Sequence, residues 1–369
     1  MKTAVLYNSQ LEKYSFGKGH PFGGDRFSVF FKFFKTRFCP YKDQLELIQP
    51  EPADDKMLEL VHSRHYIQTI RSASGGKIVA DIYRYASQDN LNPLTGYIPS
   101  GIEEGAKAIV GISLSSAELV AENRFEKAIG IGGGMHHAKP KFAEGFCFYN
   151  DIAICARRLK QKYNLERILI LDTDAHAGNG TMEIFYNDPQ VLFIDIHQDP
   201  RTIYPGTGFI SEIGEGQGEG FTVNLPLSPG AGNQAYKYLF EEIIFPLGRE
   251  FAPQAIIRYG GSDPHYLDTL TNLGLTLDGF KMIGEQVRIM SRELTADKSI
   301  DLLLSGYNLS VLPYAWSALI AGLLDLNIDL SGLKEESAPA LDSGLSQARD
   351  MAGQLRKYLK KHWKCMNRN

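Results

Sequence analysis

Short apolar runs rich in Ile, Val and Leu recur along the chain, and most of them end at a glycine or an acidic residue. Six runs begin at Ala4, Lys127, Arg167, Val191, Ala255 and Ile300. Several are continuous rather than alternating, which is typical of strands buried on both faces of a parallel sheet. Segments with helical spacing lie between them, over 100–122, 146–163, 233–251 and 278–294. This alternation predicts an α/β fold with a mostly parallel central sheet flanked by helices.

The pattern indicates a single domain over residues 1–332. One weak linker, LKEESAPALDSG, spans Leu333–Gly344 and is followed by apolar residues at helical spacing up to Leu359. We therefore expect 333–369 to form a linker and a C-terminal helix that packs on the domain by one face. The lysines of this basic segment are expected on its solvated face.

The composition excludes several classes of protein. With 369 residues, 43% hydrophobic residues and a net charge of −4, the chain can build a large core and has no basic excess for direct binding of nucleic acid. The four cysteines have no CxxC spacing, so neither a thiolate zinc site nor a disulfide framework is indicated. The N-terminus lacks the pattern of a signal peptide, and no apolar run reaches about 18 residues. We expect a cytoplasmic protein with no membrane segment.

Chemically active side chains follow four of the predicted strands. His136 and His137 come after the second run; Asp172, Asp174 and His176 follow the third; Asp263 and Tyr307 follow the fifth and sixth. Ligands of an open α/β sheet bind beyond the carboxyl ends of its strands, so these residues are expected to converge. Asp172, Asp174 and His176 would share one side if the backbone stays extended.

Two aspartates and one histidine, Asp174, His176 and Asp263, form a three-ligand set that leaves a position open, as in catalytic zinc sites. Asp172 is better placed to accept a histidine N–H. An alternative is that DTDAHAGNG is only a turn that caps a helix near Asn179. A dinucleotide loop at GIGGGMHH is rejected because Met135 stands where a third glycine is required.

At this point the sequence resembles a known family. GGGMHHAKPKFAEGFCFYNDIAI, LDTDAHAGNGT, YPGTG, GGSD followed by LGLT, and SGYN occur in the order typical of the zinc-dependent histone deacetylase superfamily, which includes acetoin-utilisation proteins and acetylpolyamine amidohydrolases. The match runs from about Gly17 to Leu324 and is closest to class II-like bacterial members. The resemblance implies an arginase-deacetylase fold and zinc-dependent hydrolysis of acylated lysine side chains, which releases a carboxylate and the free amine.

The resemblance also implies roles for individual residues. The zinc ligands, one ion per chain, would be Asp174, His176 and Asp263. The catalytic group would comprise His136, His137, Tyr307, Asp172 and Asn179. Phe146, Tyr204, Gly145 and Leu270 would line the acyl-lysine tunnel, and Arg26 would lie at the product exit. Backbone carbonyls near Asp172, Asp174, His176, Asp195 and Ile196 resemble a structural potassium site.

This sequence departs from the family's usual pattern at several positions. Asn179 stands where one branch has aspartate, Ser305 replaces a frequent glycine, and Tyr97 occupies the expected position of an aspartate that holds a peptide backbone. SDPHYLD is bulkier than usual and brings His265 near the rim, where we expect it to pack rather than bind metal. The Tyr97 position leaves peptide and small-molecule substrates both open.

Three other functions are compatible with parts of this residue pattern. A binuclear manganese ureohydrolase would need further aspartates beside His176 and Asp263, and the sequence lacks them. Hydrolysis of acetylpolyamines or other small acetylated amines is a closer alternative, although Leu270 stands where a polyamine-selecting enzyme could place glutamate. A catalytically silent acyl-lysine binding protein is disfavoured because every expected catalytic residue is present. The sequence does not determine the acyl length, the natural substrate, the oligomeric state or the role of the basic C-terminal helix.

Overall fold

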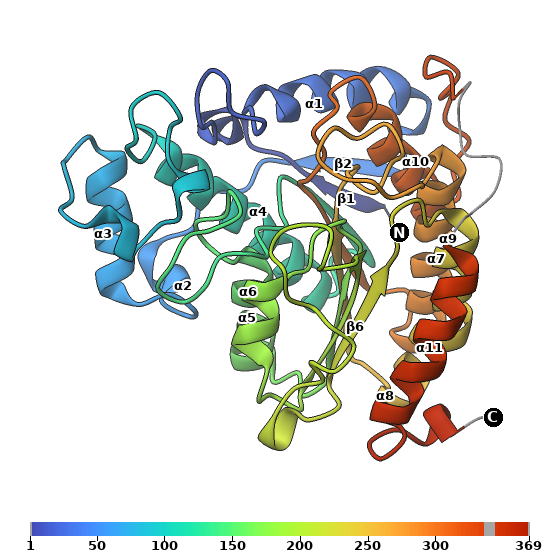
Figure 1. Cartoon of the computed structure of the whole chain (residues 1–369). Helices are drawn as coiled ribbons and strands as arrows, with labels where there is room; N and C mark the ends of the chain where they lie inside the picture. Colours follow the sequence, from blue (N-terminus) through green and yellow to red (C-terminus); the bar gives the residue numbers. More distant parts are fainter. Residues whose placement is uncertain (1, 336–343, 368–369) are drawn as a thin grey trace.

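A computed structural model describes residues 2–335 and 344–367 of the chain. Its centre is an eight-stranded, all-parallel sheet with the strand order β2-β1-β3-β8-β7-β4-β5-β6 (Figure 1). The strands are β1 Thr3–Leu6, β2 Leu45–Ile48, β3 Lys127–Ile131, β4 Ile168–Asp172, β5 Val191–Gln198, β6 Thr222–Leu227, β7 Ala255–Gly260 and β8 Ser299–Leu303. The predicted α/β fold with helices around a parallel sheet is confirmed.

Six of the strands coincide with the six apolar-rich runs, and all of their residues are buried. The sequence analysis missed the two strands at the edges of the sheet, β2 and β6. β2 reads LELI and exposes Glu46 and Leu47, so it lacks an apolar run. β6 contains Pro226, which cannot donate a ladder hydrogen bond and is tolerated on an edge strand.

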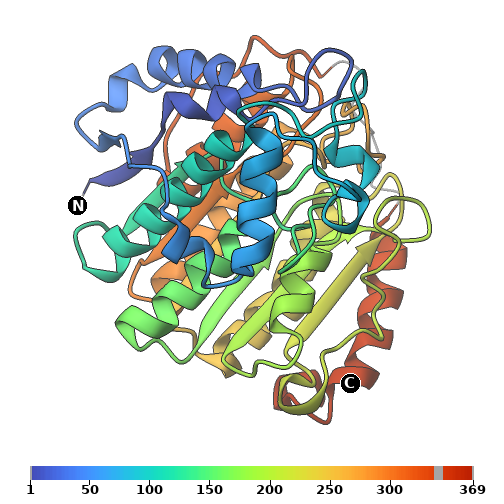
Figure 2. The ribbon, with the colours of Figure 1, turned by 90° about the vertical axis from the view of Figure 1, so that its left-hand side faces the viewer.

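Helices cover both faces of the sheet (Figures 1 and 2). The first layer contains α4 Ile102–Ala121, α5 Asp151–Tyr163 and α6 Asn179–Phe185, with α2 Asp55–Leu58 and α3 Arg64–Ser74 outside it. The second contains α7 Asn233–Leu239, α8 Phe245–Phe251, α9 Leu277–Leu294, α10 Leu312–Leu324 and α11 Leu345–Leu359, and α1 Asp25–Arg37 contacts α10. Short 3₁₀ segments lie at Ser9–Lys13, Cys39–Tyr41, Ile82–Arg84, Gln88–Asn90, Gly216–Gly218 and Lys364–Asn367, and a π-helical turn, Phe240–Ile244, joins α7 to α8.

Helix α5 begins at Asp151, five residues later than the start predicted from the sequence at position 146. Gly145 and Phe146 have positive φ angles of 57° and 64°, which a helix cannot contain. The Asn150 side chain then accepts the Ala153 N–H and caps the helix that begins at Asp151. The segment 146–150 is thereby left as loop beside the carboxyl end of the sheet, where Phe146 lines a cavity.

The C-terminal segment contains an amphipathic helix, α11. α11 contacts α7 and β6, and its buried residues are Ala348, Met351, Ala352, Leu355 and Leu359. Trp363 donates its indole N–H to the Gly220 carbonyl at 2.7 Å and adds a second anchor. Most of the predicted linker lies outside the described residues. No helix in the described part of the chain combines the length and the apolar character needed to span a membrane.

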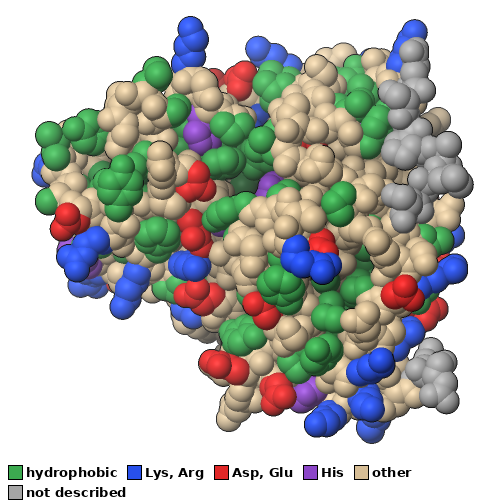
Figure 3. Space-filling view, viewed as in Figure 1, with side chains coloured by type: hydrophobic (Ala, Val, Ile, Leu, Met, Phe, Trp, Pro, Cys, Tyr) green, Lys and Arg blue, Asp and Glu red, His purple; other side chains and the backbone are tan. Residues whose placement is uncertain are grey.

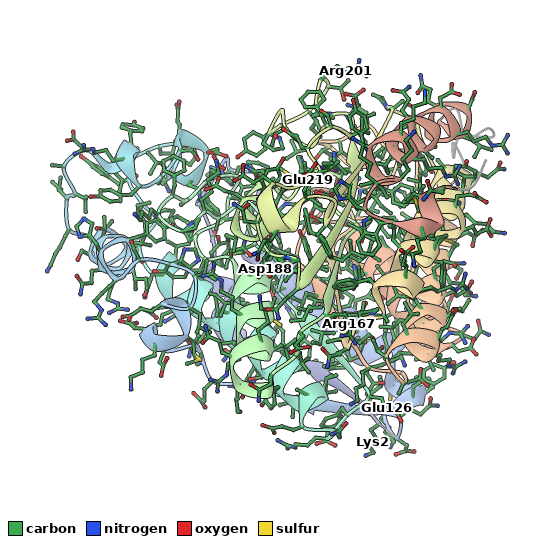
Figure 4. The ribbon with its side chains drawn as sticks, turned by 90° about the horizontal axis from the view of Figure 1, so that it is seen from below. Lys2, Glu126, Arg167, Asp188, Arg201 and Glu219 are labelled. Carbon is green, nitrogen blue, oxygen red and sulfur yellow. The ribbon has the colours of Figure 1, made fainter. Side chains whose placement is uncertain are left out.

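The two ends of the sheet differ in chemistry. Figure 4, which shows the molecule from below, labels a charged residue shortly before each of the strands β1, β3, β4, β5 and β6. These residues are Lys2, Glu126, Arg167, Asp188 and Glu219. The histidines and aspartates singled out above lie at the opposite, carboxyl end. That end therefore contains the candidate active site, as expected for an open α/β sheet.

Candidate active site

The segment after β4 brings its polar side chains together by turning. The strand ends at Asp172, so the backbone does not stay extended through His176 and the condition for a shared side of a strand is not met. The Asp174 N–H donates to Asp172 Oδ1 at 2.9 Å, and the His176 N–H donates to Asp174 Oδ1 at 2.8 Å. These side-chain to backbone bonds make successive turns, and α6 begins at Asn179 directly afterwards.

Asp174, His176 and Asp263 form a buried set of donor atoms suited to a metal ion. One ligand atom from each lies within 4.8 Å of the others. His176 Nδ1 is 3.1 Å from Asp174 Oδ1 and 3.1 Å from Asp263 Oδ2. Burial and the neighbouring Asp174 raise the pKa of Asp263 to about 7, because two carboxylates repel each other there. A divalent cation would relieve that repulsion, and one nitrogen with two carboxylate oxygens fits such an ion.

The adjacent histidines have different partners. His136 Nδ1 lies 2.9 Å from Asp172 Oδ2, whereas His137 Nδ1 lies 2.7 Å from the amide oxygen of Asn179. Burial opposes protonation of His136, but Asp172 and Asp174 outweigh it and raise its pKa to about 9. Burial, and then the charges of His136 and His176, lower the pKa of His137 well below 6.5. The surroundings thus favour the protonated form of His136 and the neutral form of His137, which in that form can accept a proton.

A cavity of about 370 Å³ opens over this centre. It is lined by Asp89, His137, Gly145, Phe146, His176, Ile203, Tyr204, Leu270 and Tyr307. Hydrophobic and histidine side chains gather near the middle of the face drawn in Figure 3. A Cβ atom at Gly145 would lie 2.2 Å from the His137 ring, so only glycine allows this wall to approach the histidine. Tyr204 and Leu270 are 42% and 41% exposed, as expected of side chains at a cavity mouth.

Tyr307 lines the cavity, and Arg26 lies next to it. The Tyr307 ring centroid lies 6.2 Å from that of His176 and 6.0 Å from that of Phe146. Arg26 is fully buried, and its guanidinium lies 5.4 Å from the Tyr307 ring centroid. It donates to the carbonyl oxygens of Pro21, Gly23 and Leu304. A buried cation therefore lies behind the tyrosine.

The sequence analysis missed three acidic residues of the site. Asp89 lines the cavity and accepts the Gly145 N–H at 2.9 Å, while Tyr97 is not among the lining residues. Asp268 accepts the Tyr307 N–H at 2.8 Å, and Glu144 accepts a hydrogen bond from the Asn179 amide nitrogen at 2.7 Å. Each contact joins residues far apart in the sequence. Glu144 and Asp268 lie within sequence segments quoted above, AEGF and HYLD, and this position was the only indication of them in the sequence.

Two further residues near the site have other partners. His265 is fully buried and its Nε2 lies 2.9 Å from Glu335 Oε1, away from the metal-ligand set. Asp195 on β5 accepts the Gly178 N–H at 2.8 Å and lies 2.9 Å from the His197 ring. The structure brings the predicted site residues together around one cavity. Of the candidate metal ligands, His176 lines the cavity, and Asp174 and Asp263 lie next to it. Asp172 and Asn179 contact the two histidines, and Arg26 lies next to Tyr307.

Comparisons with known proteins agree with this geometry. A family model of the histone deacetylase domain matches residues 20–323. Acetoin utilization protein AcuC of Staphylococcus aureus (strain MSSA476) is 36% identical over 326 residues, which cover 88% of this chain and 82% of the relative. A probable deacetylase of Archaeoglobus fulgidus is 33% identical over 376 residues, covering 99% of both chains. AcuC of Staphylococcus xylosus is 35% identical over 326 residues, covering 87% and 82%.

Proposed function

This chain belongs to the histone deacetylase family, and from that premise we propose that it is a zinc-dependent amidohydrolase that removes acetyl or other short acyl groups from lysine side chains. One observation carries the proposal. The buried Asp174–His176–Asp263 set lies next to His137, and His137 and His176 line a cavity with aromatic walls. The products would be a carboxylate and the free amine.

The three ligands fit zinc because they offer one imidazole nitrogen and two carboxylate oxygens, and none of them is a thiolate. Bound there, zinc would supply the Lewis acidity that acidifies water and polarises an amide carbonyl. The potassium ion implied by the resemblance stays a prediction, as does the cytoplasmic location.

The protein's own residues would move the protons. His137, held at Nδ1 by Asn179, would take the water proton at Nε2 and return one to the leaving amine. His136, charged through Asp172, would favour the negative charge that develops next to it. Burial and then Asp263 raise the pKa of Tyr307 well above 10, so its hydroxyl stays protonated and can donate to the oxyanion.

The cavity walls support an acyl-lysine substrate. Phe146 and Tyr204 present aromatic surface to an aliphatic stem, and Gly145 lets the wall come close to His137. A narrow apolar passage also excludes water, which strengthens electrostatic interactions at its floor. The buried Arg26 guanidinium behind Tyr307 would attract the carboxylate product.

A second candidate is the deacetylation of small acetylated amines. It is favoured by Asp89, whose carboxylate lines the cavity and could pair with a second ammonium group of a polyamine. The relatives named for acetoin utilization leave the natural substrate of this chain open.

The deciding experiment measures zinc content and hydrolysis on one preparation. The substrates are an acetyl-lysine peptide, a peptide with a longer acyl chain, and acetylated polyamines. We expect about one zinc per chain and peptide hydrolysis that a chelator abolishes. Activity on polyamines alone would move the function to the second candidate. Zinc binding without any turnover would favour an acyl-lysine binding protein.

A further inference from the structure

A chain of polar contacts runs from His137 toward the surface. His137 Nδ1 lies 2.7 Å from Asn179 Oδ1, and Asn179 Nδ2 donates to Glu144 Oε1 at 2.7 Å. Lys139 Nζ lies 3.2 Å from the same Glu144 oxygen and 3.4 Å from Glu183. His137 and Asn179 are buried, whereas the Glu144 side chain is 16% exposed. A surface ion pair thus reaches a buried histidine through one amide.

The donor and acceptor properties of these groups determine which atom carries the proton in each hydrogen bond between Glu144 and His137. An ionised carboxylate only accepts hydrogen bonds, so the NH₂ group of Asn179 must face Glu144. The amide oxygen then faces His137, and this oxygen also only accepts. His137 must therefore carry its proton on Nδ1, and in the neutral ring the Nε2 lone pair is left free.

We propose that Glu144 is a positioning residue that selects the Nδ1–H tautomer of His137 by fixing the orientation of the Asn179 amide. This inference rests on the proposed function, in which His137 accepts a proton at Nε2. Glu144 does not touch His137 itself and acts through Asn179. Lys139 holds the Glu144 oxygen in place and balances its charge.

Without an acceptor at position 144, the Asn179 amide has two orientations of similar quality. Rotated by half a turn, its NH₂ group would donate to His137 Nδ1 and drive the proton to Nε2. That tautomer has no lone pair at Nε2 and cannot act as a base there. An aspartate at position 179 would have no such ambiguity, because both carboxylate oxygens accept.

The test compares Glu144→Gln, which keeps an acceptor oxygen that Lys139 can hold, with Glu144→Leu, which has none. Nitrogen-15 NMR of the zinc-loaded protein with labelled histidine reports the tautomer, and a His137→Phe variant assigns the signal. We expect the Nδ1–H form in the wild type and in Glu144→Gln. In Glu144→Leu we expect a shift toward Nε2–H and a kcat lower by about 10- to 10²-fold, with little change in KM.

Two further variants separate positioning from a loss of structure. Asn179→Asp in the Glu144→Leu background should restore the Nδ1–H tautomer and part of kcat, because a carboxylate only accepts. Glu183→Gln removes the other partner of Lys139 without touching Asn179, and should change neither the tautomer nor kcat.

The NMR signal is read without substrate, so the two proposals can fail separately. A tautomer shift in a protein that hydrolyses no amide would support the role of Glu144 and contradict the proposed function. An unchanged Nδ1–H signal and unchanged kcat in Glu144→Leu would overturn the inference. The inference would also be overturned if Asn179→Asp in the Glu144→Leu background restored neither the Nδ1–H tautomer nor any part of kcat.

Discussion

At the scale of single residues, Ser305 makes a direct contact with the candidate metal-ligand set. Its hydroxyl donates to Asp263 Oδ1 at 2.6 Å, and both side chains are buried. The bond occupies one carboxylate oxygen and leaves Oδ2, 3.1 Å from His176 Nδ1, to face the metal position. Such supporting hydrogen bonds typically contribute about 10- to 100-fold to metal affinity.

We therefore predict that Ser305→Ala lowers zinc affinity by about tenfold or more, as measured by competition with a chromogenic chelator. Ser262→Ala is the matched control. Its buried hydroxyl has no hydrogen-bond partner in the described part of the chain, so zinc affinity should not change. Equal affinities for the wild type and Ser305→Ala would mean that Ser305 contributes nothing to metal binding.

Tyr307 offers a test of the chemistry rather than of the metal. Its hydroxyl is the proposed donor to the oxyanion, and it is not among the three ligands. Tyr307→Phe should lower kcat by about 10²-fold or more, as for the loss of one oxyanion donor. Zinc content, measured on the same sample, should stay at the wild-type level. A variant with full zinc and full turnover would remove Tyr307 from the mechanism.

At the scale of elements, the loop after β7 supports the loop after β8. Asp268 accepts the N–H groups of Leu270 at 2.9 Å and of Tyr307 at 2.8 Å. Thr269 Oγ1 donates to the Tyr307 carbonyl at 3.2 Å, and Asn308 Nδ2 donates to the Leu267 carbonyl at 2.8 Å. The SDPHYLD loop therefore fixes the backbone that carries Tyr307, the proposed oxyanion donor.

Asp268→Ala removes the acceptor for the Tyr307 N–H. We expect kcat to fall by about 10- to 10²-fold while zinc affinity is kept, because small misplacements of a catalytic group are costly. Thr269→Val, which removes only the longer bond at the exposed edge, should have a smaller effect. If both variants had wild-type kcat, the Tyr307 loop would not depend on this support.

The elements also show what the sequence could predict. A buried strand such as β4, with the sequence ILILD, appears as a continuous apolar run, and the residues after the predicted strands were correctly expected to meet at one end of the sheet. Edge strands lack this signal, since β2 is half exposed and β6 contains a proline. The contacts of Glu144 with Asn179 and of Asp268 with Tyr307 depend on loop conformations that neither periodicity nor spacing determines.

At the scale of the whole molecule, folding buries titratable groups that the proposed chemistry does not use. His62, just before α3, is 2% exposed, and its Nε2 accepts the Asn150 N–H at 2.9 Å. Asn150 caps α5 and donates to the carbonyl oxygens of His136 and Ala138. A neutral His62 therefore anchors the outer helices to the loop that carries the histidine pair.

This burial predicts how stability depends on pH. Burial lowers the pKa of His62 to about 3, from an ordinary value near 6.5. Between these two values the unfolded chain binds the proton and the folded protein does not, so this histidine makes stability rise with pH. Above about pH 6.5 the buried His62 does not lower the free energy of unfolding. As the pH falls below that value, the free energy of unfolding decreases at a rate that approaches about 1.4 kcal/mol per pH unit.

His62→Gln keeps an acceptor for the Asn150 N–H and removes the titrating group. We expect the free energy of unfolding, measured with urea from pH 7 to pH 4.5, to fall less steeply with acid in the variant than in the wild type. The two curves should diverge below about pH 6, because only the unfolded wild type takes up this proton. His65→Gln, at an exposed position on α3, controls for the loss of a histidine as such. Parallel curves for the wild type and His62→Gln would show that His62 does not resist protonation in the folded protein.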